Sequence, residues 1–563
     1  MKTTNKNNKM VELRFLFLWG LLAGFLCFVI TYGIQVLNVT YDAWIFHGDT
    51  DLKQHYLGWC HYRITPWHFP LGMIDSLSYP TSVSMLWTDS IPIFSIVFKL
   101  FRSVLPETFQ FFGLFACLSF GLQGGIATLL IRKFTDNLYV CLVMSFVFIW
   151  SFPILQRTFY HTSLCAQWII LLSLLLWFSD IYKRSTVSKA MIWGAMGMLC
   201  VFIHSYFLPM VACIMCGSLL EELIIKKKIT PIIVSIGSFG LCSLLSLYVI
   251  GAFAGNVSPD YGIGQFEMNL NSLLNSLGEG RLLKGLPLYF DTQYEGFGYL
   301  GAGMIVLGFI FLGIILYKMC NCFKQKIPVV ELVKMHPRKS IVFLVCTIFL
   351  LVAACPNISL GNILIVHIPY PRFVNSILGI FRSNGRFVWP IMYLIIIASV
   401  AVISKKFKKQ TVSLLITFCL ILQLIDLSSM ISKKRDIYSD GNQSYTSIWN
   451  IEEINQVIDH YDHFVLMLND NELVMTTAYY AYANDMTLNR YYYARDIDKQ
   501  IEKNLEVYVE GLHNQKPEEN CIYLFDEATV KDYKDSGLHF YEISRWIFGT
   551  KDSVEGLTEL KIS

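Results

Sequence analysis

Long apolar segments recur along most of this 563-residue chain, and they constrain its fold more than any other feature. A helix needs about 20 predominantly apolar residues to cross a bilayer. Segments that approach this length lie near residues 13–33, 108–131, 138–156, 163–181, 187–204, 206–225, 231–253, 299–318, 340–356, 389–404 and 411–429. Only 15% of the residues are charged. The sequence therefore predicts a mainly α-helical fold, a polytopic membrane bundle of about 11 transmembrane helices.

Basic residues in alternate connections predict how the bundle is oriented. If the N-terminus is cytoplasmic, every inner connection is basic, from Arg132-Lys133 to the run between Lys405 and Lys409. Such connections favour the cytoplasmic side. The segment Ile91–Val104 is short and amphipathic, and a crossing there would place the later basic clusters outside. We therefore expect an interfacial helix there, in a multi-pass protein of the cell membrane.

Two domains are predicted. Residues 1–429 form the transmembrane domain, with long outer loops at 34–107, 254–298 and 357–388, and the first of these loops contains interfacial helices. Residues 430–563 are more polar and form a small extracytoplasmic α/β domain. This tail contains three β-rich runs and one helical stretch: His463–Leu468, Cys521–Phe525, Leu538–Ile543 and Asp496–Gly511.

Other general features exclude several classes of protein. The net charge of +3 gives no electrostatic reason to expect a nucleic-acid partner. The fifteen cysteines lack paired metal spacing and lie mostly in apolar spans. The apolar run Leu13–Tyr32 is too long for a signal peptide and has no small-residue cleavage site, so it is expected to be a retained helix.

A dense titratable cluster follows the first apolar span. Asp49 and Asp51 are candidate catalytic residues, because a carboxylate at a membrane boundary can act as a general base or bind a divalent cation. In a helix, Asp51 would share a face with Gln54 and His55. The alternative is that one aspartate caps the helix and the others face solvent. Trp59 suits sugar stacking and an interfacial aromatic belt equally well.

The last outer loop contains two arginines, Arg382 and Arg386, in a Gly- and Asn-containing turn that opens onto an apolar span. Guanidinium groups match phosphate oxygens and remain charged at any working pH. The alternatives are contacts with lipid headgroups or an ion pair with the tail. Glu295, at the mouth of another span, could bind a hydroxyl or a second charged group, or could simply lie in a flexible loop.

Three further residues are interpreted structurally. Asp89, in Thr88-Asp89-Ser90-Ile91-Pro92, is expected to cap the interfacial helix. His161 and His204 end their apolar spans, and single histidines in such places are expected to be satisfied by structural contacts rather than to act as ligands.

The arrangement of these parts resembles the GT-C superfamily of membrane glycosyltransferases. The resemblance is closer to a bacterial branch named for the domain of unknown function 6311. It covers roughly residues 10 to 430 and rests on these motifs: Gly48-Asp49, Gln54-His55, Gly58-Trp59, Trp67-x-Phe69-Pro70-Leu71-Gly72, Thr88-Asp89-Ser90-Ile91-Pro92 and Phe381-Arg382-Ser383-Asn384-Gly385-Arg386-Phe387-x-Trp389-Pro390.

The resemblance implies transfer of a sugar, with inversion, from a polyprenyl-phosphate donor to a glycan, lipid or protein acceptor on the outer face of the bacterial inner membrane. It assigns the role of base or metal ligand to Asp49, with Asp51 second. Arg382 and Arg386 would stabilise the departing phosphate. The remaining substrate-binding candidates are Gln54, His55, Trp59 and Glu295. No cofactor is fixed by these residues, although the carboxylates could hold a divalent cation (Mg or Mn).

Two alternatives stay open. A transporter or flippase of lipid-linked saccharide would carry ionisable residues near the midplane of its spans, and these spans are poor in interior charge. A polymerase or ligase of surface polysaccharide would also use outer-loop arginines, and the acidic first loop counts against it.

Overall fold

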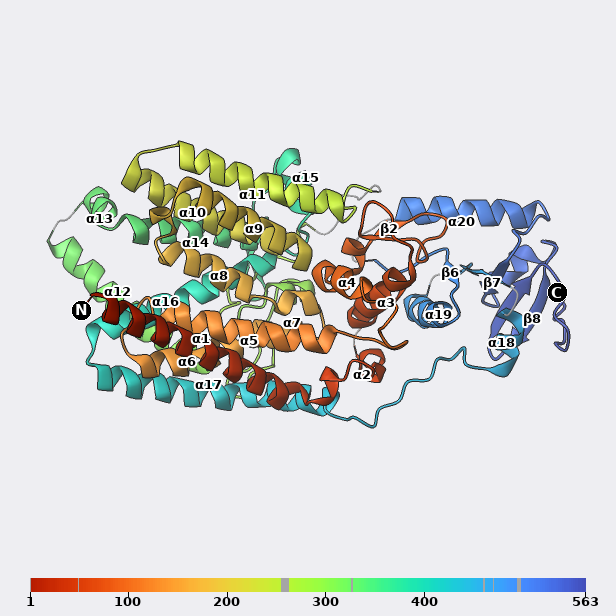
Figure 1. Ribbon diagram of the computed structural model, residues 1–563, viewed down its shortest axis with the longest axis horizontal. Coiled ribbons are helices and arrows are strands. Elements are labelled where there is room, and N and C mark those ends of the chain that lie inside the picture. The colour runs from red at the N-terminus through yellow and green to blue at the C-terminus, as the bar shows by residue number, and fades with distance from the viewer. Residues whose placement is uncertain are drawn as a thin grey trace.

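The fold is given by a computed structural model that describes residues 2–48, 50–254, 263–325, 328–458, 461–468, 470–493 and 498–562. Figure 1 shows three parts along the longest axis: a helical bundle, the segment of residues 34–107 that joins helices α1 and α5, and a C-terminal domain. We call residues 34–107 the first connecting segment. It lies between the other two parts, so it contacts both.

The bundle confirms the predicted polytopic membrane fold. Among the described residues, ten helices are long and apolar enough to cross a membrane, and the predicted span 163–181 corresponds to the shorter apolar helix Thr162–Phe178. The bundle contains α1 (Lys2–Tyr32), α5 (Phe112–Ile131), α6 (Leu138–Ile149), α7 (Phe152–Arg157), α8 (Trp168–Phe178), α9 (Thr186–Ile203), α10 (Phe207–Lys226), α11 (Thr230–Val249), α12 (Ala302–Lys324), α14 (Pro337–Ala354), α16 (Val388–Lys406) and α17 (Lys409–Tyr438). By length and composition, the chain is a multi-pass membrane protein.

Glycines allow α1 and α5 to pack with their backbones in contact. A Cβ added to Gly124 on α5 would collide with the carbonyl oxygen of Gly20 on α1, and a Cβ on Gly20 would collide with Gly124 in return. One turn further along α1, Gly24 contacts the backbone of Phe120 in the same way. Small residues spaced four apart let membrane helices approach closely, where dispersion contacts and lipid exclusion hold them together.

Ion pairs join the helices at the end of the bundle near the N-terminus and the short helix α13 (Val329–Met335) (Figure 1). Arg338 at the start of α14 pairs with Asp180 at 2.5 Å and with Glu221 near the end of α10 at 2.7 Å. Lys189 in the first turn of α9 pairs with Glu222. These ionic groups therefore lie in or beside the terminal turns of their helices.

The first connecting segment folds into short elements. Its helices are α2 (Ala43–Phe46), α3 (Thr50–Ile64) and α4 (Pro92–Lys99), with 3-10 turns η1 (Gln35–Leu37) and η2 (Met85–Thr88) and the strand pair β1 (Met73–Ile74) and β2 (Val83–Ser84). At eight residues, α4 is far too short to cross a bilayer. The prediction that Ile91–Val104 contains a helix that does not cross is therefore confirmed.

The C-terminal domain is a small α/β domain, as predicted. Its five-stranded sheet has the order β6-β5-β7-β9-β8, with β5, β6 and β7 parallel and β9 antiparallel to both of its neighbours. The elements are α18 (Glu452–Ile458), β5 (His463–Leu466), α19 (Asn471–Ala483), β6 (Thr487–Leu488), α20 (Asp498–His513), β7 (Cys521–Phe525), η7 (Val530–Tyr533), β8 (His539–Ile543) and β9 (Trp546–Thr550). Strands β6 and β9 were not predicted. Strand β6 has only two residues.

The C-terminal domain packs on the first connecting segment through backbone and side-chain contacts. The amide of Tyr79 donates to the carbonyl of Leu488, and the amide of Leu488 donates to the carbonyl of Ser76, both at 2.7 Å. The rings of Tyr79 and His463 stack with centroids 4.1 Å apart. These contacts fix the domain against the segment that contains α3.

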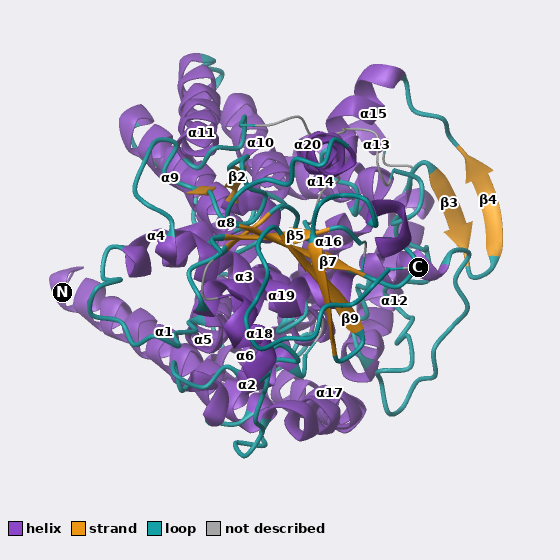
Figure 2. Cartoon of the chain, turned by 90° about the vertical axis from the view of Figure 1, so that its right-hand side faces the viewer, coloured by secondary structure: helices purple, strands orange, loops and turns teal. Residues whose placement is uncertain are grey.

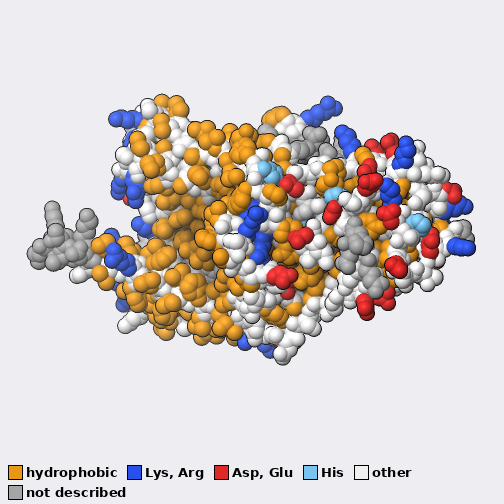
Figure 3. All heavy atoms as spheres, turned by 45° about the vertical axis from the view of Figure 1, so that its right-hand side comes forward, with side chains coloured by type: hydrophobic (Ala, Val, Ile, Leu, Met, Phe, Trp, Pro, Cys, Tyr) orange, Lys and Arg blue, Asp and Glu red, His pale blue; other side chains and the backbone are white. Residues whose placement is uncertain are grey.

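A β-hairpin and the helix that follows it lie at the edge of the molecule. The hairpin of β3 (Asn357–Leu360) and β4 (Ile363–His367) stands apart from the bundle in Figure 2, and helix α15 (Arg372–Gly379) follows it in the chain. Figure 3 shows apolar side chains over the bundle and most of the visible Asp and Glu side chains over the C-terminal part. This distribution suits a bundle in lipid and a domain in water.

The glycine contact predicts a site where added volume destabilises the bundle. We expect Gly124→Val to lower the free energy of unfolding by about 1–3 kcal/mol, because the new side chain must separate α1 from α5. The matched control is Gly308→Val on α12, where an added Cβ meets nothing within 4 Å. Thermal unfolding of both purified variants in detergent measures the difference, and equal melting temperatures would contradict the packing described here.

Candidate functional site

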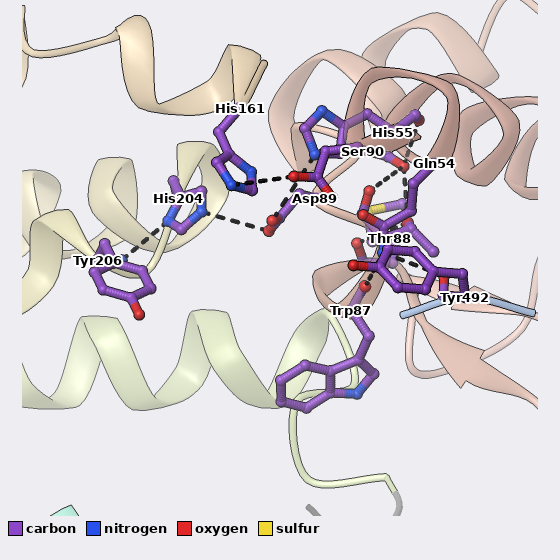
Figure 4. Close-up of polar contacts among 12 residues, drawn as sticks. Gln54, His55, Trp87, Thr88, Asp89, Ser90, His161, His204, Tyr206 and Tyr492 are labelled. Carbon is purple, nitrogen blue, oxygen red and sulfur yellow. Dashed lines mark hydrogen bonds and ion pairs between the residues drawn. The ribbon is translucent and has the colours of Figure 1, made fainter. Parts of the chain in front are cut away.

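A cluster of histidines and aspartates lies where the first connecting segment meets the ends of several bundle helices (Figure 4). His55 is on α3, and Asp89 follows η2. His161 comes from the connection after α7, and His204 is the residue after α9. Asp51, one turn before His55 on α3, completes the set, which we call the His–Asp cluster.

Each carboxylate of the cluster faces an imidazole. Asp89 Oδ1 lies 3.4 Å from His204 Nε2, and Asp89 Oδ2 lies 4.0 Å from His55 Nε2. Asp51 Oδ2 lies 3.3 Å from His161 Nε2. The side chains of Asp51 and Asp89 are each 16% exposed and that of His161 is 14% exposed. The cluster is therefore mostly desolvated but still reachable by a small ligand.

The backbone around Asp89 directs its carboxylate into the cluster. Asp89 has a left-handed conformation, with φ of 50°, and the hydroxyl of Ser90 donates to the carbonyl of His55 at 2.8 Å. The residue that precedes α4 is Ile91, and no side chain caps that helix. The prediction that Asp89 caps α4 is therefore wrong, because the left-handed turn points its side chain toward His55 and His204 instead.

Burial and charge set the protonation states. Burial lowers the pKa of His55 to about 4, against the opposing effect of Asp89. Burial also lowers the pKa of His161 well below its ordinary value, and Arg386 and Arg157 lower it further. Burial alone would raise the pKa of Asp89, but His204, His55 and Arg386 outweigh it and bring this pKa to about 2. At neutral pH, Asp89 is ionised and His55 and His161 are neutral.

The neutral histidines have free ring nitrogens. Both ring nitrogens of His55 and Nδ1 of His161 are buried and have no hydrogen-bond partner among the described residues. One donor atom from each of His55, Asp89 and His161 lies within 4.8 Å of the others, so these three residues could hold a metal ion. His204 is satisfied by structural contacts, as expected, because its Nδ1 accepts from the amide of Tyr206 and its Nε2 faces Asp89. The same expectation does not hold for His161, whose Nδ1 has no hydrogen-bond partner among the described residues.

A buried ion triad lies next to the cluster. Glu295 pairs with Arg157 at 2.9 Å and with Arg386 at 2.7 Å, and all three side chains are buried. Burial alone would raise the pKa of Glu295, but the two guanidinium groups outweigh it and lower this pKa to about 2. The Arg386 guanidinium also lies over the ring of Tyr206, 4.6 Å from its centroid. The triad carries one net positive charge.

The triad changes the interpretation of two predicted binding residues. Glu295 is engaged by two arginines, so it is not a free group for a substrate hydroxyl. Arg386 is buried and paired with Glu295 rather than open beside its neighbour in a two-arginine cradle. Arg382 lies over the ring of Phe266, with its guanidinium carbon 5.8 Å from the centroid. It is half-buried, and so more accessible than Arg386.

Two predicted residues on α3 serve packing. Trp59 is completely buried, and its Nε1 donates to the carbonyl of Phe109 at 2.8 Å, so its ring offers no face for a sugar. Gln54 is also buried, and its amide donates to the carbonyls of Trp87 and Tyr492 at 3.2 Å each. Asp49, the first choice for a catalytic base, lies outside the described residues.

Sequence reasoning missed the roles of Asp89, Arg157, His161 and His204. A usable signal was present, because each of these residues lies at the end of an apolar span or just before an apolar helix. In the predicted topology, all four ends fall on the same side of the membrane as Asp51. Titratable residues that lie at the ends of several spans, all on the same side of the membrane, are candidates for a common site.

Comparison with protein families gives two matches. The domain of unknown function DUF6311 matches residues 21–428, and the DUF6311 C-terminal domain matches residues 453–551. The first match covers most of the bundle and the whole first connecting segment, and the second covers all five strands of the C-terminal sheet. No curated protein and no solved structure matches the chain.

The triad predicts a large penalty for removing its central charge. We expect Glu295→Gln to destabilise the protein by about 3–5 kcal/mol, because two buried guanidinium groups would lose their counter-charge. The matched control is Glu472→Gln, which removes a carboxylate that is 64% exposed and 2.5 Å from Lys53. That change should cost about 0–1 kcal/mol. Chemical unfolding of both variants tests this, and equal losses would argue against the triad.

Proposed function

We propose that this chain, which belongs to the DUF6311 family, is a membrane glycosyltransferase that uses a polyprenyl-phosphate-linked sugar. The acceptor would be a cell-envelope glycan, lipid or protein on the extracytoplasmic face. One observation carries the proposal. At one end of the membrane bundle, acidic residues of the first connecting segment meet two buried arginines, Arg157 at the end of α7 and Arg386 just before α16. The donor's lipid could stay in the bilayer while its sugar reaches the cluster.

Glycosyl transfer from a lipid phosphate requires two kinds of group. A base takes the proton of the acceptor hydroxyl, and positive charge stabilises the phosphate that leaves the anomeric carbon. Asp51 is the described carboxylate best suited to the first task, since it is partly exposed and is held by His161. Asp49 keeps its predicted role as a base on the strength of its place in the sequence.

The second task falls to the arginines. In the proposed reaction, the hydroxyl oxygen bonds to the anomeric carbon, the bond from that carbon to the phosphate oxygen breaks, and the configuration inverts. Arg382 would contact the departing phosphate directly, because it is half-buried rather than enclosed. Arg386 and Arg157 would act through the net positive charge of their triad with Glu295.

The alternative function is transport, and the positions of the ion pairs in the bundle help to decide between it and the enzyme. Transported ions or charged solutes generally meet ionisable groups near the middle of the membrane. The described pairs of Lys189 with Glu222 and of Arg338 with Glu221 join the terminal turns of their helices. This placement suits a structural clamp better than a conduction path, and it favours the enzyme.

The proposal predicts loss of transfer when the first-segment carboxylates are neutralised. We expect Asp49→Asn and Asp51→Asn each to lower the turnover of a polyprenyl-phosphate sugar by at least ~100-fold, because the acceptor would lose its base or the group that positions it. Turnover is measured with purified protein in proteoliposomes that contain the lipid-linked donor and an envelope-lipid fraction as acceptor.

The control for this experiment is Asp75→Asn. Asp75 also lies in the first connecting segment and also contacts a histidine, His68, at 3.0 Å, but the pair is exposed and outside the cluster. It should retain full turnover. Wild-type turnover in both Asp49→Asn and Asp51→Asn would remove these residues from the mechanism. Solute flux without any sugar transfer would favour the transporter.

A further inference from the structure

We infer that His55, His161 and Asp89 bind one divalent transition-metal ion, of the zinc class, inside the His–Asp cluster. The three residues come from α3, the connection after α7 and the turn after η2, so the ion would join the first connecting segment to the bundle. The inference concerns binding alone and can be tested without any sugar substrate. It refines the proposed site by naming its ligands and its metal class.

The spacing of the donor atoms suits an ion better than direct contacts. His55 Nε2 and Asp89 Oδ2 are 4.0 Å apart, which is too long for a hydrogen bond. In a tetrahedral zinc site, with metal–ligand distances of about 2.0–2.1 Å, any two ligand atoms stand about 3.3 Å apart. The three donors lie within 4.8 Å of one another. Small rotations of the rings would bring them onto one ion.

The unpaired nitrogens provide independent support. Polar atoms that are fully removed from water almost always have a hydrogen-bond partner. His55 is completely buried, yet neither of its ring nitrogens has a partner in the described part of the chain, and the same is true of Nδ1 of His161. A ring nitrogen without a proton is the atom that a metal binds. The ion would therefore satisfy groups that the described protein atoms leave unsatisfied.

Asp51 holds His161 in the form that a ligand requires. Nε2 of His161 lies 3.3 Å from the carboxylate of Asp51, which favours the tautomer with the proton on Nε2 and the lone pair on Nδ1. Carboxylates commonly contact the second nitrogen of a metal-bound histidine, where they fix the tautomer and raise the basicity of the ring. Asp51 and Asp89 together also balance the two positive charges of the ion.

His204 positions Asp89 in a similar way. Its Nδ1 accepts a hydrogen bond from the amide of Tyr206 at 3.1 Å, so its Nε2 carries the proton and faces Asp89 Oδ1 at 3.4 Å. This contact leaves Asp89 Oδ2 directed toward His55. His204 is therefore assigned as a positioning residue rather than as a ligand.

The ligand set selects the class of metal. Imidazole nitrogens favour Zn²⁺, Co²⁺, Ni²⁺ and Cu²⁺, whereas Mg²⁺ prefers oxygen ligands and water. Two imidazoles and one carboxylate leave a further position open on a four-coordinate ion, as in catalytic zinc sites. Such an ion could polarise a phosphate oxygen of the donor. This zinc-class ion, at the two histidines and Asp89, occupies a different site from the divalent cation (Mg or Mn) that the sequence allows at the first-segment carboxylates.

Metal binding to the purified full-length protein tests this inference. After chelation and removal of the chelator, we expect the wild-type protein to bind one equivalent of Zn²⁺ in a calorimetric titration, and excess Mg²⁺ not to compete. Asp89→Asn and His161→Gln should abolish binding. Asp51→Asn should weaken it by ~10–100-fold, because it removes only the group that holds His161.

Two further measurements keep the test independent of folding and of catalysis. His68→Gln removes an exposed histidine that faces Asp75 and should bind Zn²⁺ like the wild type. Pulsed electron-spin resonance of the Cu²⁺-loaded wild-type protein should detect two coordinated imidazoles without any substitution. Absence of stoichiometric binding, fewer than two imidazoles, or equal losses in His68→Gln and His161→Gln would overturn the inference. Zinc binding without sugar transfer would reject the glycosyltransferase and keep the metal site.

Discussion

The charge balance around Glu295 is the interaction on which the site depends. This carboxylate is buried between Arg157 and Arg386, which lie 138 and 91 residues away in sequence. Each charge would be costly alone in such a place, because desolvation of an ion is offset only by a close partner. The three residues therefore bring η5 (Asp291–Gly296), the end of α7 and η6 (Asn384–Phe387) together.

The His–Asp cluster lies beside this triad and shares a chain segment with it. His161 follows Arg157 by four residues, so the chain segment that enters the triad also delivers an imidazole to the cluster. Asp89 receives His204 on one oxygen, and Arg386 contributes to its low pKa. Fixed charges and fixed tautomers of this kind prepare a site before a ligand arrives, and this reduces the reorganisation that binding or reaction requires.

The membrane fold could be predicted from the sequence more completely than the site. The thickness of the bilayer fixes the length of an apolar helix, so spans such as Phe112–Ile131 are visible without knowledge of their neighbours. Asp89 shows the opposite case. Its local sequence is typical of a helix cap, and only the left-handed turn and the distant His204 reveal its role. Trp59 likewise suited sugar stacking or an interfacial belt by its sequence, but it is completely buried and donates to the carbonyl of Phe109.

Helix α3 connects the C-terminal domain to the site through two adjacent residues. Gln54 donates to the carbonyl of Tyr492 in the C-terminal domain, while His55 faces Asp89. His61, two turns later, contacts the carbonyl of Ala478 on α19 at 2.9 Å. Because α3 is one continuous helix, a tilt that the C-terminal domain imposed on it would also move the imidazole of His55 relative to Asp89.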